Sequence, residues 1–148
     1  MRVGDPAPDF TLVDDAGVTR SLAGLTAGGP VVLFFYPAAK TSGCTREACH
    51  FRDRGPEFAA LGAQRVGVSM DGVERQHEFS VNNAFDYPLL CDVDGVVARL
   101  YGVKRSLDLL KVRRTTFVIS KSRVVLDVIA SEVRMEVHAD RALAALAR

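Results

Sequence analysis

The stretch of residues 31–49, VVLFFYPAAKTSGCTREAC, decides how the chain folds. Its first six residues are apolar and follow two glycines and a proline, which predicts a strand that is buried on both faces. Thr41 and Ser42 are residue types that favour a helix start, and apolar side chains then recur at roughly helical spacing, at Ala48, Phe51, Phe58 and Leu61. We therefore expect a buried strand, a short loop, and a helix that carries Cys44 in its first turn.

A cysteine in the first turn of a helix is well placed to act as a nucleophile. The first backbone N–H groups of a helix lack intrahelical partners and the helix dipole is positive there, so the thiolate is favoured over the thiol. The alternative is that Cys44 is a small buried apolar residue, which is the commoner role of an isolated cysteine. The polar loop of small residues before Cys44 favours the reactive thiol.

Cys49 lies five residues after Cys44, and this spacing bears on whether the two can bond. Along an α-helix it corresponds to about 7.5 Å of rise and about 140° of rotation, which places the two Cα atoms beyond the roughly 7 Å limit for a disulfide. An intact helix therefore cannot hold this bridge, and a bond between the two would require the first turn or two to unwind. The C-x4-C spacing, followed by His50, matches neither a zinc site nor a haem attachment site.

The remaining pattern predicts an α/β fold. Turn residues at 14–17 between short extended stretches predict an N-terminal β-hairpin, and the helix that carries Cys44 should break at Gly55-Pro56 and restart at Pro56. We expect strands at 66–70, 115–120 and 124–129, a short apolar segment at 87–92, and helices at 74–83, 96–101 and 139–148. This order predicts one domain, residues 1–148, with a mixed central β-sheet flanked by helices on both faces.

Composition excludes several classes of function. The chain has 148 residues, 48% of them hydrophobic and 25% charged, as is ordinary for a globular domain. Lys and Arg (19) nearly balance Asp and Glu (18), so no net field favours nucleic acid or an anionic membrane surface. The absence of a signal-peptide pattern and of a membrane-spanning run, with three cysteines, predicts a cytoplasmic protein with reduced thiols.

Several motifs resemble one known family. Tyr36-Pro37, TSGCT at 41–45 and EAC at 47–49 are similar to the active site of the peroxiredoxin Q subfamily, also called bacterioferritin comigratory protein. The likeness extends over nearly the whole chain, through VGDPAPDF at 3–10, YPLL at 87–90, YGV at 101–103 and RTTF at 114–117. This resemblance implies a thioredoxin-like fold and a thiol-dependent peroxidase that acts on hydrogen peroxide and organic hydroperoxides.

The resemblance also implies roles for individual residues. Cys44 would be the peroxidatic nucleophile, Thr41 would hydrogen-bond the peroxide and the thiolate, Pro37 would shield the site from water, and Arg114 would lie beside the thiolate, where a permanent cation favours the anion. Each has a purely structural alternative, since Thr41 could be only a helix cap, Pro37 a loop stiffener and Arg114 a solvated surface charge. The neighbouring Arg113 should face elsewhere if this segment is extended.

Cys49 matches the family's resolving cysteine where that residue lies on the same helix as the nucleophile. It would attack the sulfenic acid on Cys44, release water and leave an intramolecular disulfide. The resemblance implies no metal or organic cofactor, a thioredoxin-like protein or a low-molecular-weight thiol as the reductant, and a monomer or weak homodimer. We expect Cys91 to be a small buried hydrophobe, and we assign no role to the scattered His50, His77 and His138.

Two other functions remain open from the sequence. One is a general thiol–disulfide oxidoreductase, although such enzymes usually resemble C-x-x-C proteins and this helix start has C-x4-C. The other is a redox-sensing module without enzymatic activity, whose oxidised form docks on a partner. If peroxide reacts no faster with Cys44 than with free cysteine, this would favour the redox-sensing module or a purely structural role for Cys44.

Overall fold

The buried strand expected at 31–36 is β3 (Val31–Phe35), an inner strand of the sheet in a computed structural model that describes residues 1–105 and 111–148. Each of its five residues is buried. Strand β3 pairs in parallel with β4 (Gln64–Ser69) and antiparallel with β6 (Thr115–Ile119). Because partners cover both its edges and both its faces, the strand is apolar throughout.

Among the described residues, seven strands form one mixed sheet in the order β2-β1-β5-β4-β3-β6-β7. The predicted N-terminal hairpin is confirmed as β1 (Thr11–Asp14) and β2 (Thr19–Ser21), and β1 also pairs antiparallel with β5 (Leu89–Cys91). The strands expected at 115–120 and 124–129 are β6 and β7 (Val125–Ala130), which pair antiparallel as a second hairpin. Strands β3, β4 and β5 run parallel and are joined through helices, so the sheet is mixed, as predicted.

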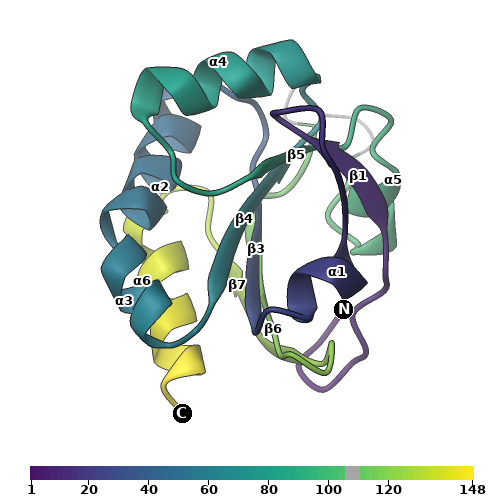
Figure 1. Cartoon of the computed structure of the whole chain (residues 1–148), viewed down its shortest axis with the longest axis vertical. Coiled ribbons are helices and arrows are strands. Elements are labelled where there is room, and N and C mark those ends of the chain that lie inside the picture. The colour runs from purple at the N-terminus through teal and green to yellow at the C-terminus, as the bar shows by residue number, and fades with distance from the viewer. Residues whose placement is uncertain (106–110) are drawn as a thin grey trace.

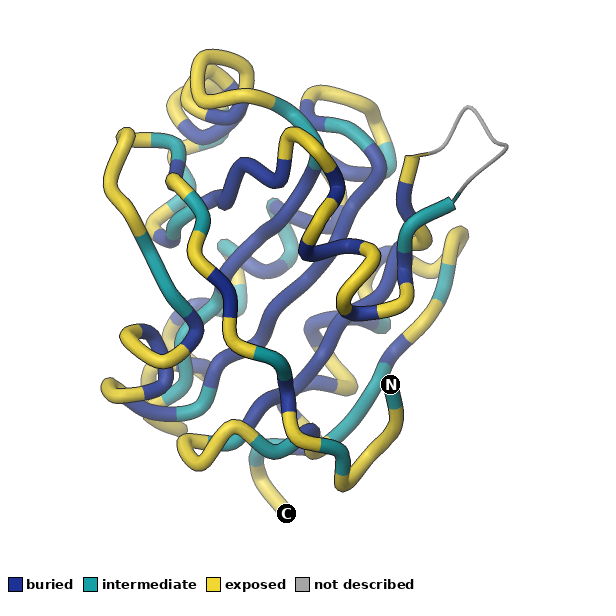
Figure 2. Tube along the Cα trace, turned by 90° about the vertical axis from the view of Figure 1, so that its right-hand side faces the viewer, coloured by how far each residue is buried: buried dark blue, intermediate teal, exposed yellow. Residues whose placement is uncertain are grey.

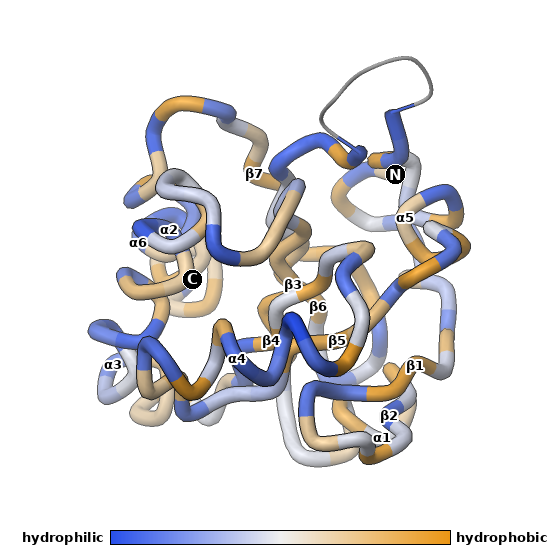
Figure 3. Tube along the Cα trace, turned by 90° about the horizontal axis from the view of Figure 1, so that it is seen from above, coloured by the Kyte–Doolittle hydropathy of each residue, from blue (hydrophilic) through white to orange (hydrophobic). Residues whose placement is uncertain are grey.

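Helices cover both faces of the sheet, as Figures 1 and 2 show, with the strands buried between them. The helices α2 (Ser42–Asp53), α3 (Gly55–Ala60), α4 (Val73–Asn83) and α6 (Met135–Leu146) pack on the face to which Val32 and Phe34 point. The shorter α1 (Leu22–Thr26) and α5 (Val96–Leu100) pack on the other face. Figure 3 shows the same layering as hydrophobic strands in the centre with mostly polar segments outside.

Two helices differ from the sequence prediction. Helix α1 was not predicted; it is capped by Ser21, whose hydroxyl accepts a hydrogen bond from the N–H of Gly24 at 3.0 Å. Helix α6 begins at Met135 rather than at 139, because His138 occupies a core position and so interrupts the apolar pattern that would have marked the first turn. The predicted break after α2 is confirmed, since α2 ends at Asp53 and α3 begins at Gly55.

Contacts from the sheet fix the second half of α2. The ring of Phe51 stacks on Phe34 of β3, with 4.2 Å between the ring centroids. The buried Tyr87 hydroxyl donates a hydrogen bond of 2.7 Å to the carbonyl of Ala48, and burial raises the pKa of this phenol, which keeps it a donor. Arg65 donates to the carbonyl of Phe51 at 3.0 Å.

No helix within the described part of the chain is long and apolar enough to cross a membrane.

Candidate active site

Cys44 lies in the first turn of α2, as predicted. The helix begins at Ser42 with Thr41 as its N-cap, and its first turn carries no acidic residue. The Cys44 side chain is 1% exposed. Its sulfur therefore lies in a largely water-free site next to the positive end of the helix dipole, where an anion is stabilised.

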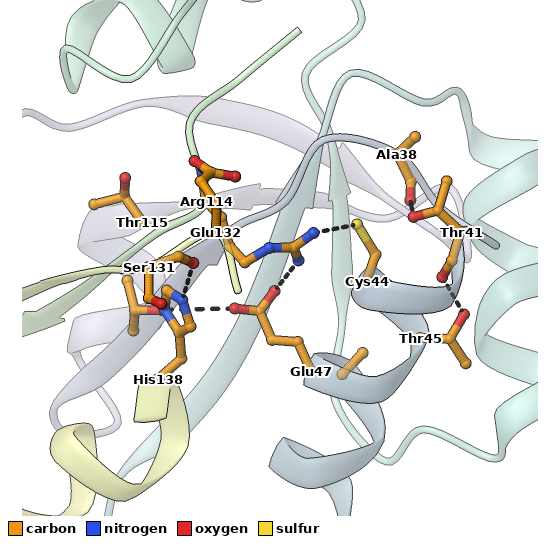
Figure 4. Close-up of polar contacts among 12 residues, drawn as sticks. Ala38, Thr41, Cys44, Thr45, Glu47, Arg114, Thr115, Ser131, Glu132 and His138 are labelled. Carbon is orange, nitrogen blue, oxygen red and sulfur yellow. Dashed lines mark hydrogen bonds and ion pairs between the residues drawn. The ribbon is translucent and has the colours of Figure 1, made fainter. Parts of the chain in front are cut away.

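Arg114 approaches this sulfur from the residue that precedes β6. Its Nη2 lies 3.3 Å from Cys44 Sγ, and its Nη1 lies 2.8 Å from Glu47 Oε1 (Figure 4). Arg114 is 6% exposed, so it is not a solvated surface charge, whereas Arg113 is exposed as expected. Burial acts to lower the pKa of Arg114, but the neighbouring Glu47 and Cys44 outweigh it and raise that pKa, so the guanidinium is a permanent cation against the sulfur.

Glu47 is a member of this cluster that the sequence analysis missed as a site residue. It lies one turn after Cys44 on the same face of α2, and its side chain is fully buried. Burial raises the pKa of Glu47 to about 8, although the charge and hydrogen bond of Arg114 act to lower it. The sequence signal for it was present, since a residue three positions after Cys44 on a helix must share the face of Cys44.

His138 of α6 completes the cluster behind Glu47. Its Nε2 lies 2.9 Å from the carbonyl oxygen of Ser131, which can only accept, so Nε2 carries a proton. Its Nδ1 lies 2.7 Å from Thr116 Oγ1. The same Nδ1 lies 3.4 Å from Glu47 Oε2 (Figure 4). Burial lowers the pKa of His138. The sequence analysis assigned this histidine no role because nothing in its spacing connects α6 to α2.

Pro37 and Thr41 lie at a pocket that Arg114 also lines. Both line a pocket of about 440 Å³ together with Ala38, Ser42, Gly43, Met70, Asp71, Lys111, Arg114 and Glu132. Thr41 is the N-cap of α2 through its backbone, but its side chain does not cap the helix; its hydroxyl instead donates to the carbonyl of Ala38 at 2.8 Å. The lone pairs of that hydroxyl therefore remain available to accept a hydrogen bond from a ligand.

Cys49 faces away from Cys44. Its sulfur lies 3.7 Å from Asn83 Oδ1 of α4, and burial raises the pKa of this thiol while the nearby Arg52 acts to lower it. Cys44, Cys49 and Cys91 carry free thiols. The continuous helix from Ser42 to Asp53 holds Cys44 against Arg114 and Cys49 against α4, as the separation along the helix predicted.

Cys91 lies apart from this cluster, on β5. It is buried as predicted, and burial, with further contributions from Asp15, Asp14 and Asp71, raises the pKa of its thiol to about 11. This thiol is therefore protonated and unreactive near neutral pH. Within residues 1–105 and 111–148, no three His, Cys, Asp or Glu side chains are grouped so that they could hold a metal ion.

Comparison with known proteins gives consistent results. A sequence profile of the AhpC/TSA family matches residues 3–128. The crystal structure of peroxidoxin BcpB from Mycobacterium tuberculosis matches with a TM-score of 0.96 at 56% identity, over 99% of this chain and 97% of that one. The bacterioferritin comigratory protein of Xanthomonas campestris, studied for its alkyl peroxide reduction activity, matches with a TM-score of 0.86 at 33% identity, over 93% of this chain and 90% of that one. The chloroplastic peroxiredoxin Q of Sedum lineare is 38% identical over 140 residues, which are 95% of this chain and 75% of that protein.

A sulfur anion that attacks a peroxide needs a cation beside it and a pocket for the substrate. Arg114 is that cation, and the pocket lined by Pro37 and Thr41 lies next to it. On the fold shared with the structures above, this site defines the class of thiol peroxidases. The chain belongs to the AhpC/TSA family and, within it, to the peroxiredoxin Q group. Its substrate is a peroxide and its electrons come from a thiol reductant. The expected fold class is confirmed.

Proposed function

We propose that Cys44 is the peroxidatic residue of an atypical 2-Cys peroxiredoxin that reduces hydrogen peroxide and organic hydroperoxides. The observation that carries this proposal is the 3.3 Å contact between Arg114 Nη2 and Cys44 Sγ in a buried site. The thiolate attacks the terminal peroxide oxygen, an S–O bond forms as the O–O bond breaks, and the leaving oxygen takes up a proton. Arg114 stabilises the thiolate before the attack and the developing negative charge during it.

The pocket next to Arg114 fits the roles proposed for Thr41 and Pro37. The Thr41 hydroxyl donates to Ala38, so it would hold a peroxide by accepting the peroxide's O–H. Pro37 is buried at the wall of the pocket and would exclude water from the sulfur. Ala38 and Met70 supply apolar surface in the same pocket, whose volume of about 440 Å³ leaves room for the organic group of a hydroperoxide.

Cys49 would resolve the sulfenic acid on Cys44 after the start of α2 unwinds. The end of α2 is tied down by Tyr87 and Arg65, which bond the carbonyls of Ala48 and Phe51. The beginning of α2 is held by the contacts that Arg114 makes to Cys44 and Glu47. Oxidation replaces the anionic sulfur by a neutral group, which weakens the contact between Arg114 and Cys44 in the first turn and favours opening from the N-terminal end.

Replacing Cys49 by serine should leave the first oxidation intact and block the intramolecular disulfide. Cys44 then stays as the sulfenic acid or is overoxidised, because the nearby resolving thiol is gone. Mass spectrometry after one equivalent of peroxide distinguishes these products. An internal disulfide formed in this variant through Cys91 would contradict both the assignment of Cys49 and the unreactive state of Cys91.

Hydrogen exchange should show that oxidation unfolds α2 locally. Within residues 44–53, we expect the amides of the first turns to lose most protection in the disulfide form, while those of β3 keep it. The break at Gly55-Pro56 isolates α3 from the loss of hydrogen bonds upstream. The comparison is made between reduced and oxidised protein, with the Cys44–Cys49 bond confirmed by mass. Unchanged protection of α2 in a confirmed disulfide would contradict the proposed opening.

Tyr87→Phe should make this opening easier. The variant removes the hydrogen bond to the Ala48 carbonyl but keeps the ring in the core, at a cost of about 1 kcal/mol. If that bond is broken in the open state, the disulfide should form up to about fivefold faster after sulfenic acid formation. Rapid-mixing kinetics measures this rate. An unchanged rate in a variant with the expected loss of stability would place the opening entirely before Ala48.

The reductant is an external dithiol protein of thioredoxin type or a low-molecular-weight thiol. Peroxide consumption with a panel of such reductants tests the proposal as a whole. Turnover that depends on Cys44 and on one class of reductant supports it. Reduction of insulin disulfides at a rate above that of peroxide consumption would instead favour a general thiol–disulfide oxidoreductase.

A further inference from the structure

The buried cluster behind Cys44 contains one permanent cation and two groups that can be anions. Arg114 lies between the Cys44 sulfur at 3.3 Å and the Glu47 carboxylate at 2.8 Å. The three residues are at most 6% exposed. If sulfur and carboxyl were both ionised, the cluster would carry an uncompensated negative charge out of water, which is strongly unfavourable.

The hydrogen-bond geometry shows where a compensating proton fits. Glu47 Oε2 is buried and has no hydrogen-bond partner among the described residues. His138 Nδ1 lies 3.4 Å from this oxygen. The Nε2 proton of His138 is already donated to the Ser131 carbonyl, so a neutral imidazole presents a bare Nδ1. A single proton on either Oε2 or Nδ1 places a donor opposite an acceptor across this contact, which a small approach of the two side chains would turn into a hydrogen bond. The Thr116 hydroxyl can rotate to suit either arrangement.

We propose that Glu47 and His138 together hold one proton while Cys44 is a thiolate, and give it up when a peroxide converts the sulfur into a neutral sulfenic acid. This inference rests on Cys44 being the peroxidatic residue. The raised pKa of Glu47 and the lowered pKa of His138 agree with a proton that lies mainly on the carboxyl group.

The proton balance follows from the chemistry. The sulfur loses two electrons and forms an S–O bond, the O–O bond breaks, and the departing alkoxide or hydroxide requires one proton to become an alcohol or water. In the same step the Glu47–His138 pair loses one proton, so none is taken from solvent overall. The Glu47 carboxylate then replaces the thiolate as the counter-ion of Arg114, and the net charge of the cluster does not change.

The charges that surround the pair come from several elements. Arg114 at the start of β6 favours the ionised carboxylate and also opposes protonation of His138. Glu132, in the loop before α6, favours a protonated pair. Arg141 of α6 opposes a charged imidazole, although it also lies 3.7 Å from Asp127. Arg114 makes the shortest of these contacts, and its other partner is the Cys44 sulfur, so a change of charge on that sulfur acts on the pair through Arg114.

Infrared and ultraviolet spectra of the reduced protein test the inference without any peroxide. The pH is chosen so that wild type shows the ultraviolet absorbance of a thiolate and Cys44→Ser does not. At this pH, the infrared spectrum of wild type should show the carbonyl band of a protonated carboxyl group. Glu47→Gln should lose that band, and Glu136→Gln, which removes an exposed carboxyl of α6, should keep it. A thiolate without the carboxyl band would overturn the proposal, and because no turnover is involved, this result is independent of the proposed function.

His138→Gln tests the imidazole. The variant can keep a donor for the Ser131 carbonyl but lacks the Nδ1 acceptor, so the carboxyl band should move to the position of a carboxyl without a hydrogen bond. An unmoved band would mean that His138 only packs in the core and does not share the proton.

Proton uptake on oxidation gives a second readout. When one equivalent of hydrogen peroxide converts weakly buffered, reduced protein to the disulfide, wild type should take up almost no protons. Glu47→Gln should take up one proton per peroxide, because its amide has none to give. Uptake of one proton per peroxide by wild type would overturn the proposal. A product without the disulfide, identified by mass in the same sample, would instead count against Cys49 as the resolving residue. The infrared result does not depend on Cys49 and would still decide the proposal.

Discussion

Cys44→Ser is expected to lower peroxidase turnover by on the order of a thousandfold or more. A serine hydroxyl is a far weaker nucleophile than a thiolate, and the helix N-terminus and Arg114, 3.3 Å from the sulfur, are arranged to stabilise a sulfur anion. Serine is close to cysteine in size, so the fold should survive in this tightly packed position. Loss of activity would therefore report the loss of the nucleophile and not of the structure.

The measurement is steady-state peroxide consumption with an excess of thiol reductant, with circular dichroism to confirm the fold. Cys91→Ser is the matched control, since it removes a buried thiol of raised pKa on β5 and should keep most of the turnover. Turnover near the wild-type rate in Cys44→Ser would show that another group attacks the peroxide.

Arg114→Ala is expected to slow the oxidation of Cys44 by roughly 10²–10³-fold, the usual cost of removing one donor from a preorganised site of charge stabilisation. The variant removes the cation that lies 3.3 Å from the sulfur. Arg113→Ala is the matched control, because Arg113 is the adjacent residue in the chain but is exposed. Rapid mixing of reduced protein with peroxide measures the oxidation step separately from recycling.

Arg114→Ala should also lower the free energy of unfolding, because Glu47 loses the partner of its fully buried carboxylate. If Glu47 is protonated at neutral pH, this loss is smaller than the roughly 3–5 kcal/mol typical of a broken buried ion pair. Chemical denaturation of both arginine variants measures it. A large loss of stability together with an unchanged oxidation rate would make Arg114 a structural residue.

Local signals in the sequence were sufficient for the part of the fold that positions the sulfur. The apolar run of β3 and the helix-start residues before Cys44 predict the strand, the loop and the helix turn without any long-range information. Arg114 was found only through resemblance to a family, since nothing local distinguishes it from the exposed Arg113 beside it.

The rest of the cluster depends on tertiary structure. His138 reaches Glu47 because α6 packs beside α2 on one face of the sheet, and no sequence spacing encodes that contact. The same residue hid the beginning of its own helix, since a histidine at a core position reads as a polar interruption. Buried polar residues that satisfy one another across elements are therefore the features that sequence patterns conceal in this protein.

The position of both cysteines on one helix also sets how easily the enzyme is recycled. In the proposed cycle, the disulfide exists only while the first turns of α2 are unwound, and their packing and hydrogen bonds return when it is reduced. The free energy of refolding these turns therefore adds to the driving force for reduction. Each 1.4 kcal/mol of it raises the two-electron reduction potential of the disulfide by about 30 mV, which makes the oxidised enzyme a stronger oxidant toward its reductant.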